Sequence, residues 1–268
     1  MRLNKVKQIW REGKPAVGAW LSIPSGFSAE VMAHTGVDWL CIDMQHGCID
    51  YSDVVPMLTA ISTTDVTPFV RVPWNEPSVI MKVLDAGAYG VIVPMVSNKE
   101  EAEKAVAACR YPPAGMRSNG PNRALLYGGA DYQKHSDKEM ACVVMIETVE
   151  GIEKMEEIIS TPGVDAAYIG PTDLALALGL APVMDNDDPI HVATVNKMLE
   201  ICKKHNVVAG IHTGSSKFTQ RYIDQGFQMV MLVADRSAMS SYVKAEAARL
   251  SGWTPQSKTG TTTTSNGY

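Results

Sequence analysis

The stretch Leu84–Pro94, LDAGAYGVIVP, contains the end of a helix, a turn and a buried strand in immediate succession. Gly87 stands where a helix can end in a left-handed residue, a conformation that glycine adopts without steric cost. The apolar run Gly90–Pro94 does not alternate with polar residues, so it predicts a parallel strand buried on both faces. The same order of helix, glycine and strand recurs at Gly36 and Gly226. This repeated unit is typical of an α/β barrel.

Eight apolar runs of this kind follow one another, separated by helical patterns such as Ser78–Ala86 and Lys99–Cys109, the latter with Asn98 as its N-cap. The predicted strands are Ala16–Leu21, Trp39–Asp43, Thr67–Arg71, Gly90–Pro94, Ala141–Ile146, Ala166–Ile169, Val208–Ile211 and Met229–Val233. Eight βα units favour an α/β fold of the closed (β/α)8 TIM barrel type, with an open doubly wound sheet as the alternative.

The composition fits one large domain, because 46% of the 268 residues are hydrophobic. We expect residues 1–250 to form a single barrel, and residues 251–268, rich in Thr, Ser and Gly, to form a disordered tail. Two segments interrupt the regular pattern. Tyr111–Glu139 is expected to be a long Gly/Pro/Asn-rich connection between strands four and five, and Pro182–Pro189 a short acidic insertion.

Charge and cysteine usage limit the partners and the compartment. A net charge of −5 provides no basic field for nucleic acid or an anionic membrane. No apolar stretch approaches the roughly 20 residues of a membrane span, and the N-terminus lacks the apolar region of a signal peptide. Five dispersed cysteines without a C-x-x-C pair fit a reducing, cytoplasmic environment.

Two carboxylates follow neighbouring predicted strands, at the face where barrel enzymes place their active sites. Glu147 ends the fifth strand and Asp173 follows the sixth. Since neighbouring strands lie about 5 Å apart, the two acids could share a hard cation such as Mg²⁺ or Mn²⁺. Each has an ordinary alternative: Glu147 would complement a helix dipole, and Asp173 would cap the helix that Gly170–Asp173 opens.

Other polar groups follow the remaining strands. Arg71 is placed to stabilise an oxyanion, or alternatively to form a salt bridge with Asp43 or Glu147. His46 could transfer protons with Asp43 as its orienting group, or could be a loop residue bonded to the backbone. Free N–H groups at Gly170–Asp173 could receive a substrate carboxylate. No lysine ends a predicted strand, which argues against Schiff-base chemistry.

These segments, in this order, resemble the HpcH/HpaI family of class II pyruvate aldolases over roughly Leu3 to Leu250. The matching stretches are GAWLSIPS (Gly18–Ser25), DWLCIDMQHG (Asp38–Gly47), PFVRVPWN (Pro68–Asn75), LDAGAYGVIVPMV (Leu84–Val96), YPPAGMRSNGPNRALLYG (Tyr111–Gly128), MIETVEGI (Met145–Ile152) and IGPTDLALALG (Ile169–Gly179).

The resemblance implies a metal-dependent lyase that cleaves a 4-hydroxy-2-oxo acid to pyruvate and an aldehyde. Glu147 and Asp173 would hold Mg²⁺ or Mn²⁺, with Co²⁺ as an alternative. Arg71 would steady the pyruvate enolate, and His46 with Asp43 and a water molecule would form the acid/base apparatus.

Further implications concern the pocket and the assembly. Asp85 would reach His46 from a neighbouring subunit, the amides near Thr172 and Asp173 would receive the substrate carboxylate, and Trp20 would line the pocket. The small-molecule partners would be a 2-oxo acid and an aldehyde, and the chain would assemble as a homo-oligomer, a trimer or a hexamer.

Two positions depart from the family pattern. Gln45 stands where the family usually has Glu, and Met145 stands where many aldolases have Gln. These departures keep alternatives open: oxaloacetate decarboxylation or another enolate C–C bond-forming reaction on the same scaffold, or a non-catalytic barrel that binds a 2-oxo acid. A citrate-lyase-like acyl-CoA lyase ranks lower, because the chain has no basic cluster suited to CoA phosphates.

Overall fold

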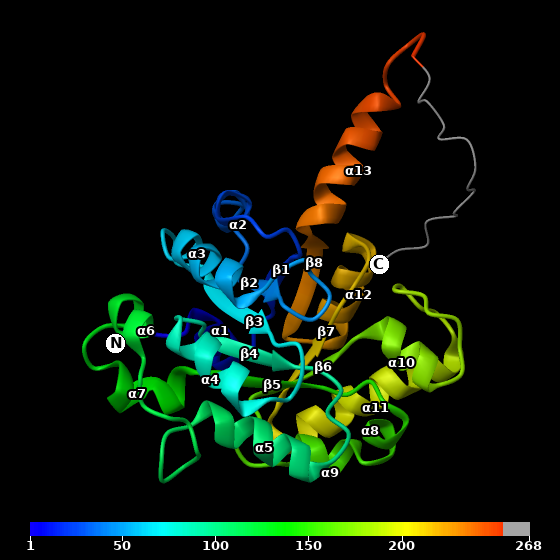
Figure 1. The fold of residues 1–268 in the computed structure, drawn as a ribbon. Helices are drawn as coiled ribbons and strands as arrows, with labels where there is room; N and C mark the ends of the chain where they lie inside the picture. The colour runs from blue at the N-terminus through cyan, green and yellow to red at the C-terminus, as the bar shows by residue number, and fades with distance from the viewer. Residues whose placement is uncertain (254–268) are drawn as a thin grey trace.

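Eight parallel strands form a closed barrel in the computed structural model, which describes residues 1–253 (Figure 1). Each strand pairs with the next, and β8 pairs with β1. The strands are β1 (Ala16–Leu21), β2 (Trp39–Asp43), β3 (Thr67–Arg71), β4 (Gly90–Val93), β5 (Ala141–Met145), β6 (Ala166–Ile169), β7 (Val208–Ile211) and β8 (Met229–Ala234). The TIM barrel prediction is therefore confirmed, and the open sheet is excluded.

The strand limits follow the prediction closely, because parallel barrel strands are apolar on both faces. Three ends differ by one residue: β4 stops at Val93, β5 stops at Met145, and β8 continues to Ala234. Beyond Met145, the Ile146 N–H still donates to the Tyr168 carbonyl at 3.1 Å, so the chain stays beside β6 up to the residue before Glu147.

The helices follow the strands in regular alternation. They are α1 (Lys5–Arg11), α2 (Gly26–Ala33), α3 (Tyr51–Ile61), α4 (Pro77–Asp85), α5 (Lys99–Cys109), α6 (Asn122–Gly128), α7 (Tyr132–Glu139), α8 (Val149–Glu153), α9 (Met155–Ile159), α10 (Pro171–Ala177), α11 (Pro189–His205), α12 (Ser216–Gln225) and α13 (Asp235–Ala247). The Asn98 side chain caps α5 as predicted, accepting from the Glu101 N–H. Gly87 and Gly226 have the predicted positive φ, 107° and 104°.

The connection Tyr111–Glu139 does join β4 to β5, after α5, but it contains two short helices, α6 and α7, that the sequence analysis did not predict. Its glycines and prolines are concentrated before Asn122, and the two short helices follow them. The acidic insertion after Pro182 does lack helix and strand until α11 begins at Pro189.

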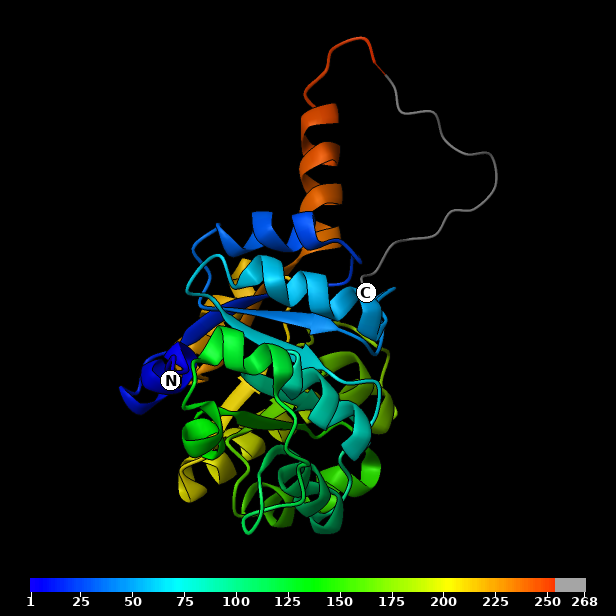
Figure 2. The same ribbon diagram turned by 60° about the vertical axis from the view of Figure 1, so that its left-hand side comes forward.

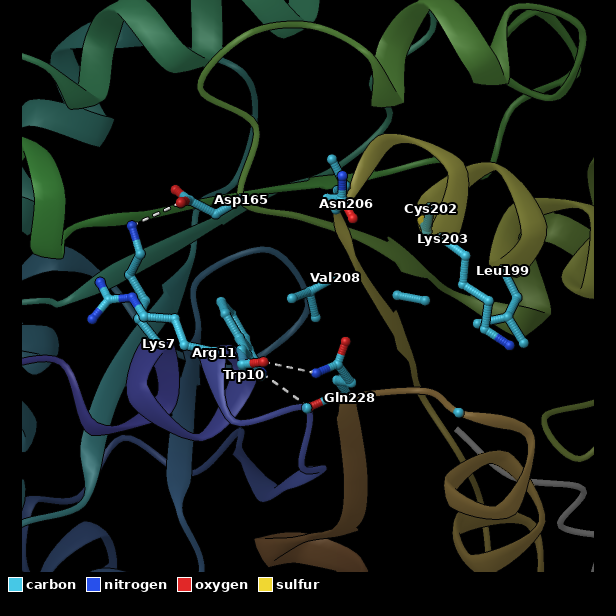
Figure 3. Close-up of a pocket in the computed structure, with 14 residues that line it drawn as sticks. Lys7, Trp10, Arg11, Asp165, Leu199, Cys202, Lys203, Asn206, Val208 and Gln228 are labelled. Carbon is cyan, nitrogen blue, oxygen red and sulfur yellow. Dashed lines mark hydrogen bonds and ion pairs between the residues drawn. The ribbon is translucent and has the colours of Figure 1, made fainter.

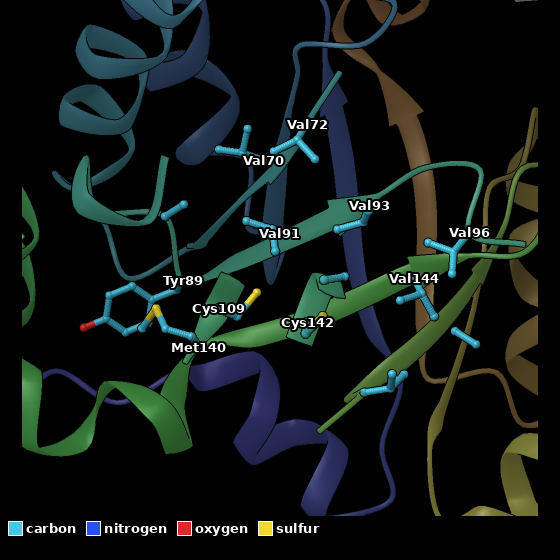
Figure 4. Packing of buried hydrophobic residues seen from close by; sticks show 14 of the residues in the cluster. Val70, Val72, Tyr89, Val91, Val93, Val96, Cys109, Met140, Cys142 and Val144 are labelled. Atoms are coloured by element: carbon cyan, nitrogen blue, oxygen red, sulfur yellow. The ribbon is translucent and has the colours of Figure 1, made fainter. Parts of the chain in front are cut away.

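The core has two layers. Inside the barrel, large rings fill the space, among them Trp20, Trp39, Phe69 and Tyr168. Gly18 leaves room for this filling, because a Cβ there would lie 2.0 Å from the Trp39 ring. Between the sheet and the helices lies a second layer of mainly branched aliphatic residues, part of which Figure 4 shows.

Helix α13 departs from the barrel pattern. Whereas the other strands are followed by helices that return along the sheet, α13 leaves the body of the protein from the end of β8 (Figures 1 and 2). No helix within residues 1–253 is long and apolar enough to cross a membrane. The predicted disordered tail falls almost entirely on residues 254–268, outside the described residues.

Candidate active site

Glu147 lies two residues past the end of β5 and is only 3% exposed. Its Oε1 accepts a hydrogen bond of 3.1 Å from the Met95 N–H. Its Oε2 is buried and has no hydrogen-bond partner among residues 1–253. A buried carboxylate oxygen without a partner is costly, so this atom indicates a ligand position rather than ordinary helix capping.

Asp173 lies in the first turn of α10 and faces the same region. Burial, together with the negative charge of Asp173, raises the pKa of Glu147 to about 7. Two acids that repel one another in a buried place are a suitable pair of ligands for a divalent cation. Within residues 1–253 no group of three or more His, Cys, Asp or Glu side chains gathers as a closed metal cage. The pair therefore fits an ion that keeps positions for water and substrate oxygens.

Gly170 makes the approach of these two acids possible. A Cβ at this position would lie 2.4 Å from Glu147 Oε2 and 3.1 Å from Met145 Cε. The backbone between β6 and α10 thus passes directly against the free oxygen. This close approach explains why a glycine stands at position 170, since any side chain there would meet the Glu147 carboxylate.

Arg71 forms a two-pronged ion pair with Asp43 across the ends of β2 and β3. Its Nε donates to Asp43 Oδ1 at 2.8 Å, and one terminal nitrogen donates to Oδ2 at 2.6 Å. Burial alone would raise the pKa of Asp43, but the Arg71 guanidinium outweighs it and lowers the pKa. The salt-bridge alternative for Arg71 is thus realised with Asp43, and it leaves the other terminal nitrogen of the guanidinium outside this pair.

The structure does not bring the Asp43 carboxylate to the His46 ring. Asp43 Oδ1 accepts from the backbone N–H groups of Gln45 and His46, at 3.1 and 3.2 Å. We predicted that Asp43 orients the His46 imidazole. In the structure, Asp43 instead bonds the backbone of the loop that carries His46. The His46 side chain is exposed, and Gln45 Oε1 is buried without a partner in the part of the chain that the structure describes.

The Trp20 ring contacts three other residues at this end of the barrel. Its ring stacks on Tyr168 with centroids 5.9 Å apart, and the Arg71 guanidinium lies 5.1 Å above it. His212 meets the same ring edge-on at 4.9 Å. Burial and the nearby charge of Arg71 lower the pKa of His212 to about 3, so its imidazole is neutral. Trp20 thus contacts Arg71, Tyr168 and His212 at the carboxyl ends of the strands, and its place in a substrate pocket stays a prediction.

Asp85 lies away from this cluster in the same chain. It ends α4, which runs back toward the start of β4, and it pairs with Arg117 at 2.7 Å. Arg117 is fully buried and also donates to the Tyr132 hydroxyl at 3.1 Å. A contact between Asp85 and His46 would require a second subunit, as the prediction stated.

Several residues near the site escaped the sequence analysis. Met95 has a positive φ of 57° that directs its N–H toward Glu147, and a non-glycine residue gives no sequence signal of this. His191, fully buried in α11, contacts the Pro171 carbonyl at 3.1 Å with Nε2 and so supports the start of α10. Tyr168 could have been found, because it precedes Gly170 by two residues on the inward face of β6.

A cavity of about 580 Å³ opens at the opposite end of the barrel, beside the starts of β6 and β7 (Figure 3). Among the described residues that line it, Asp165 is the one acidic side chain. Both Asp165 oxygens are already bonded, to Lys7 at 2.7 Å and to Arg110 at 2.9 Å. This cavity therefore has no carboxylate pair comparable to Glu147 and Asp173.

Comparisons with known proteins agree with this geometry. The sequence model described as HpcH/HpaI aldolase/citrate lyase matches residues 17–241. A hydroxypyruvate/pyruvate aldolase of Rhizorhabdus wittichii is 41% identical over 239 residues, which are 89% of this chain and 95% of that protein. A 5-keto-4-deoxy-D-glucarate aldolase of Escherichia coli O157:H7 is 35% identical over 89% of this chain and 93% of its own length.

Solved structures show the same similarity. An HpcH/HpaI aldolase/citrate lyase family protein from Burkholderia cenocepacia J2315 superimposes with a TM-score of 0.85 at 34% sequence identity. The match covers 91% of this chain and 97% of that one. The shared fold therefore extends over nearly the whole barrel.

Proposed function

Because the chain belongs to the HpcH/HpaI aldolase/citrate lyase family, we propose that it reversibly cleaves a 4-hydroxy-2-oxo acid into pyruvate and an aldehyde. The observation that carries the proposal is the buried, unpartnered Oε2 of Glu147 beside Asp173. The relatives named as aldolases support the reaction class.

Glu147 and Asp173 would hold the divalent cation, Mg²⁺ or Mn²⁺, with Co²⁺ as an alternative. Such an ion, when bound, supplies Lewis-acid polarisation of the 2-oxo group of the substrate. Met95 contributes by fixing Oε1 through its N–H, so that Oε2 is the oxygen left to point at the ion.

Arg71 supplies the positive charge for oxygen atoms that become negative as the C3–C4 bond breaks. Asp43 holds the guanidinium by two bonds, so that its orientation is set before substrate arrives. The stacked ring of Trp20 prevents the guanidinium from turning toward the barrel interior. Arg71 therefore acts as a preorganised donor.

His46 takes the proton of the substrate 4-hydroxyl in cleavage and returns it in synthesis. Its side chain is exposed at the barrel mouth, where it can meet a substrate or an acid from another subunit, for which Asp85 is our candidate. The substrate carboxylate lies at the first turn of α10, near the N–H groups of Thr172 and Asp173, which have no carbonyl to bond within the helix.

The test is a panel of aldehydes incubated with pyruvate or hydroxypyruvate and one divalent metal, with products identified by mass. We expect adducts that require Mg²⁺, Mn²⁺ or Co²⁺, disappear with EDTA, and are absent in Glu147→Gln. Glu150→Gln is the matched control, because Glu150 is a neighbouring but exposed acid in the first turn of α8, where it pairs with Lys154. Activity unaffected by EDTA and by Glu147→Gln contradicts the proposal, and pyruvate release from oxaloacetate alone would replace it with decarboxylation.

We further propose that the protein works as a homo-oligomer in a reducing cytoplasm. Its five cysteines are free. Helix α13 carries Met239, Tyr242 and Val243 on one face, 60 to 69% exposed. The barrel surface exposes Phe27 and Leu232. Apolar surfaces of this kind mark contacts between proteins, and a second copy of the chain is the partner that we assign to them, within a trimer or hexamer.

A further inference from the structure

Asp235 begins α13 and is only 2% exposed. Its carboxylate accepts from the Ser22 N–H with both oxygens, at 3.1 Å each, and from the Ser22 hydroxyl at 2.8 Å. The Ile23 N–H donates to Oδ2 at 3.1 Å. This carboxylate thus fixes two consecutive residues of the loop after β1, a segment more than two hundred positions earlier in the chain.

These bonds are unusual for a residue at a helix start. A capping carboxylate ordinarily accepts from the first turn of its own helix, whereas most of the acceptor capacity of Asp235 is directed at the loop after β1. Charge-assisted bonds to backbone N–H groups are among the stronger hydrogen bonds in proteins. The position of Ser22 is therefore set by the start of α13.

The loop of His46 rests on this fixed segment. The Cys48 N–H donates to the Ser22 carbonyl at 3.2 Å. Gly47 is pressed between the two loops, since a Cβ there would lie 3.2 Å from Ser22 Cα and 2.3 Å from the Asp43 carbonyl oxygen. The backbone immediately after His46 is thus held from one side by β2 and from the other by Ser22.

We propose that Asp235 is a positioning residue for His46, acting through Ser22 and Gly47. Asp235 connects the start of α13 to the loop after β1, and that loop in turn contacts the loop that carries the proton-transferring imidazole of His46. The inference rests on the role of His46 in the proposed function. It adds that the placement of His46 depends on a carboxylate from the far end of the sequence.

The substitution Asp235→Asn tests this, because an amide has the same shape but replaces one acceptor oxygen with a donor. We expect kcat for aldol cleavage to fall about 10- to 100-fold, the range for misplacing a catalytic group by an ångström or less, while KM for the oxo acid stays unchanged. Hydrogen exchange followed by mass spectrometry should show faster exchange in residues 44–49. Ser22→Ala removes only the hydroxyl bond and should give a smaller change in the same direction.

Asp38→Asn is the matched control. Asp38 also accepts a backbone N–H of β1, that of Val17 at 2.8 Å, but at the opposite end of the strand. Asp38→Asn should lower the free energy of unfolding without changing kcat or the rate of hydrogen exchange in residues 44–49. Unchanged kcat in Asp235→Asn overturns the inference even if aldolase activity is confirmed in the parent protein. If the parent protein has no aldolase activity, the proposed function fails, and the exchange measurement still decides whether Asp235 fixes the loop.

Discussion

At the scale of single residues, the site depends on how charges are held before substrate arrives. Arg71 is fixed by two bonds to Asp43 and by the ring of Trp20. A donor held in place in this way need not reorganise during the reaction. The salt-bridge interpretation of Arg71 is confirmed, and the proposed oxyanion role is compatible with it, because the ion pair would orient the guanidinium before substrate binds.

Replacing Arg71 by Ala should lower kcat by about 10² to 10³, as for the loss of one oxyanion donor. Arg71→Lys should recover only part of this, because an ammonium cannot pair with Asp43 at two points. Steady-state kinetics in both directions checks the result. Arg123→Ala, which removes a guanidinium bonded to the Ala86 carbonyl, should leave kcat unchanged. A full activity of Arg71→Ala would remove this residue from the mechanism.

The raised pKa of Glu147 predicts a pH dependence of stability in the metal-free protein. The pKa of Glu147 is about 7 in the folded chain, against the ordinary value of 4.5 for a glutamate carboxyl. Between these values the folded state binds the extra proton, so stability is retained below pH 4.5 and lost as pH rises through 7. The loss amounts to at most about 3 kcal/mol. Thermal unfolding of the metal-free protein, compared with Glu147→Gln from pH 5 to 8, should show this loss only in the parent.

Added metal should reverse the effect. An ion that binds the charged carboxylates stabilises the folded state by mass action, and it displaces the proton of Glu147. The gain in unfolding temperature on adding Mn²⁺ should therefore increase from pH 5 to pH 8. A gain that is the same in Glu147→Gln would contradict the assignment of this residue as a ligand.

The sequence predicted which acids lie together but not how each is bonded. Glu147 and Asp173 could be placed because the ends of adjacent parallel strands converge. The sequence named the Asp43–Arg71 salt bridge as one alternative, but it did not show that Asp43 also accepts from the backbone of the His46 loop, because that depends on the conformation of the loop. The free Oε2 of Glu147 depends on the backbone of Met95, whose conformation has no signal in the residue type.

At the scale of elements, the turn from β6 to α10 is shaped around a carboxylate. Gly170→Ala would place a methyl group 2.4 Å from Glu147 Oε2, so either the loop or the carboxylate must move. We expect metal affinity to fall by more than about tenfold, as for other disturbances of the shell around metal ligands. Isothermal titration with Mn²⁺ measures this. Gly120→Ala, where the nearest atom to a new Cβ is 3.8 Å away, should bind as the parent does.

The elements themselves were predicted well where the chain is buried. Val91 and Val143 lie in runs that are apolar on both faces, and only a parallel strand buries both. The segments α6 and α7 were missed because the glycines and prolines before Asn122 dominate the composition of that connection. Short helices of this kind are stabilised by tertiary contacts, such as the buried ring of Tyr132 against Arg117, which composition does not reveal.

At the scale of the whole molecule, closure of the barrel was predictable and the course of α13 was not. Counting βα units gives the closed sheet. The apolar positions Met239, Tyr242 and Val243 have the spacing that any amphipathic helix uses against its own barrel. The pattern is therefore the same whether the helix packs within the chain or against another copy, and only the structure shows that it leaves the body (Figure 2).

The double substitution Tyr242→Ser with Val243→Ser should shift the protein from an oligomer toward the monomer. It removes two of the exposed apolar side chains of α13. Each Å² of apolar area that these side chains bury between copies contributes about 25 cal/mol to association. Size-exclusion chromatography with light scattering measures the mass of each form. Ile190→Ser removes a similarly exposed side chain from α11 and should leave the mass unchanged. Because Asp85 of a second subunit would no longer reach His46, the dissociated form should also lose aldolase activity. A parent protein that is monomeric at micromolar concentration would contradict both the assembly and this dependence of activity on it.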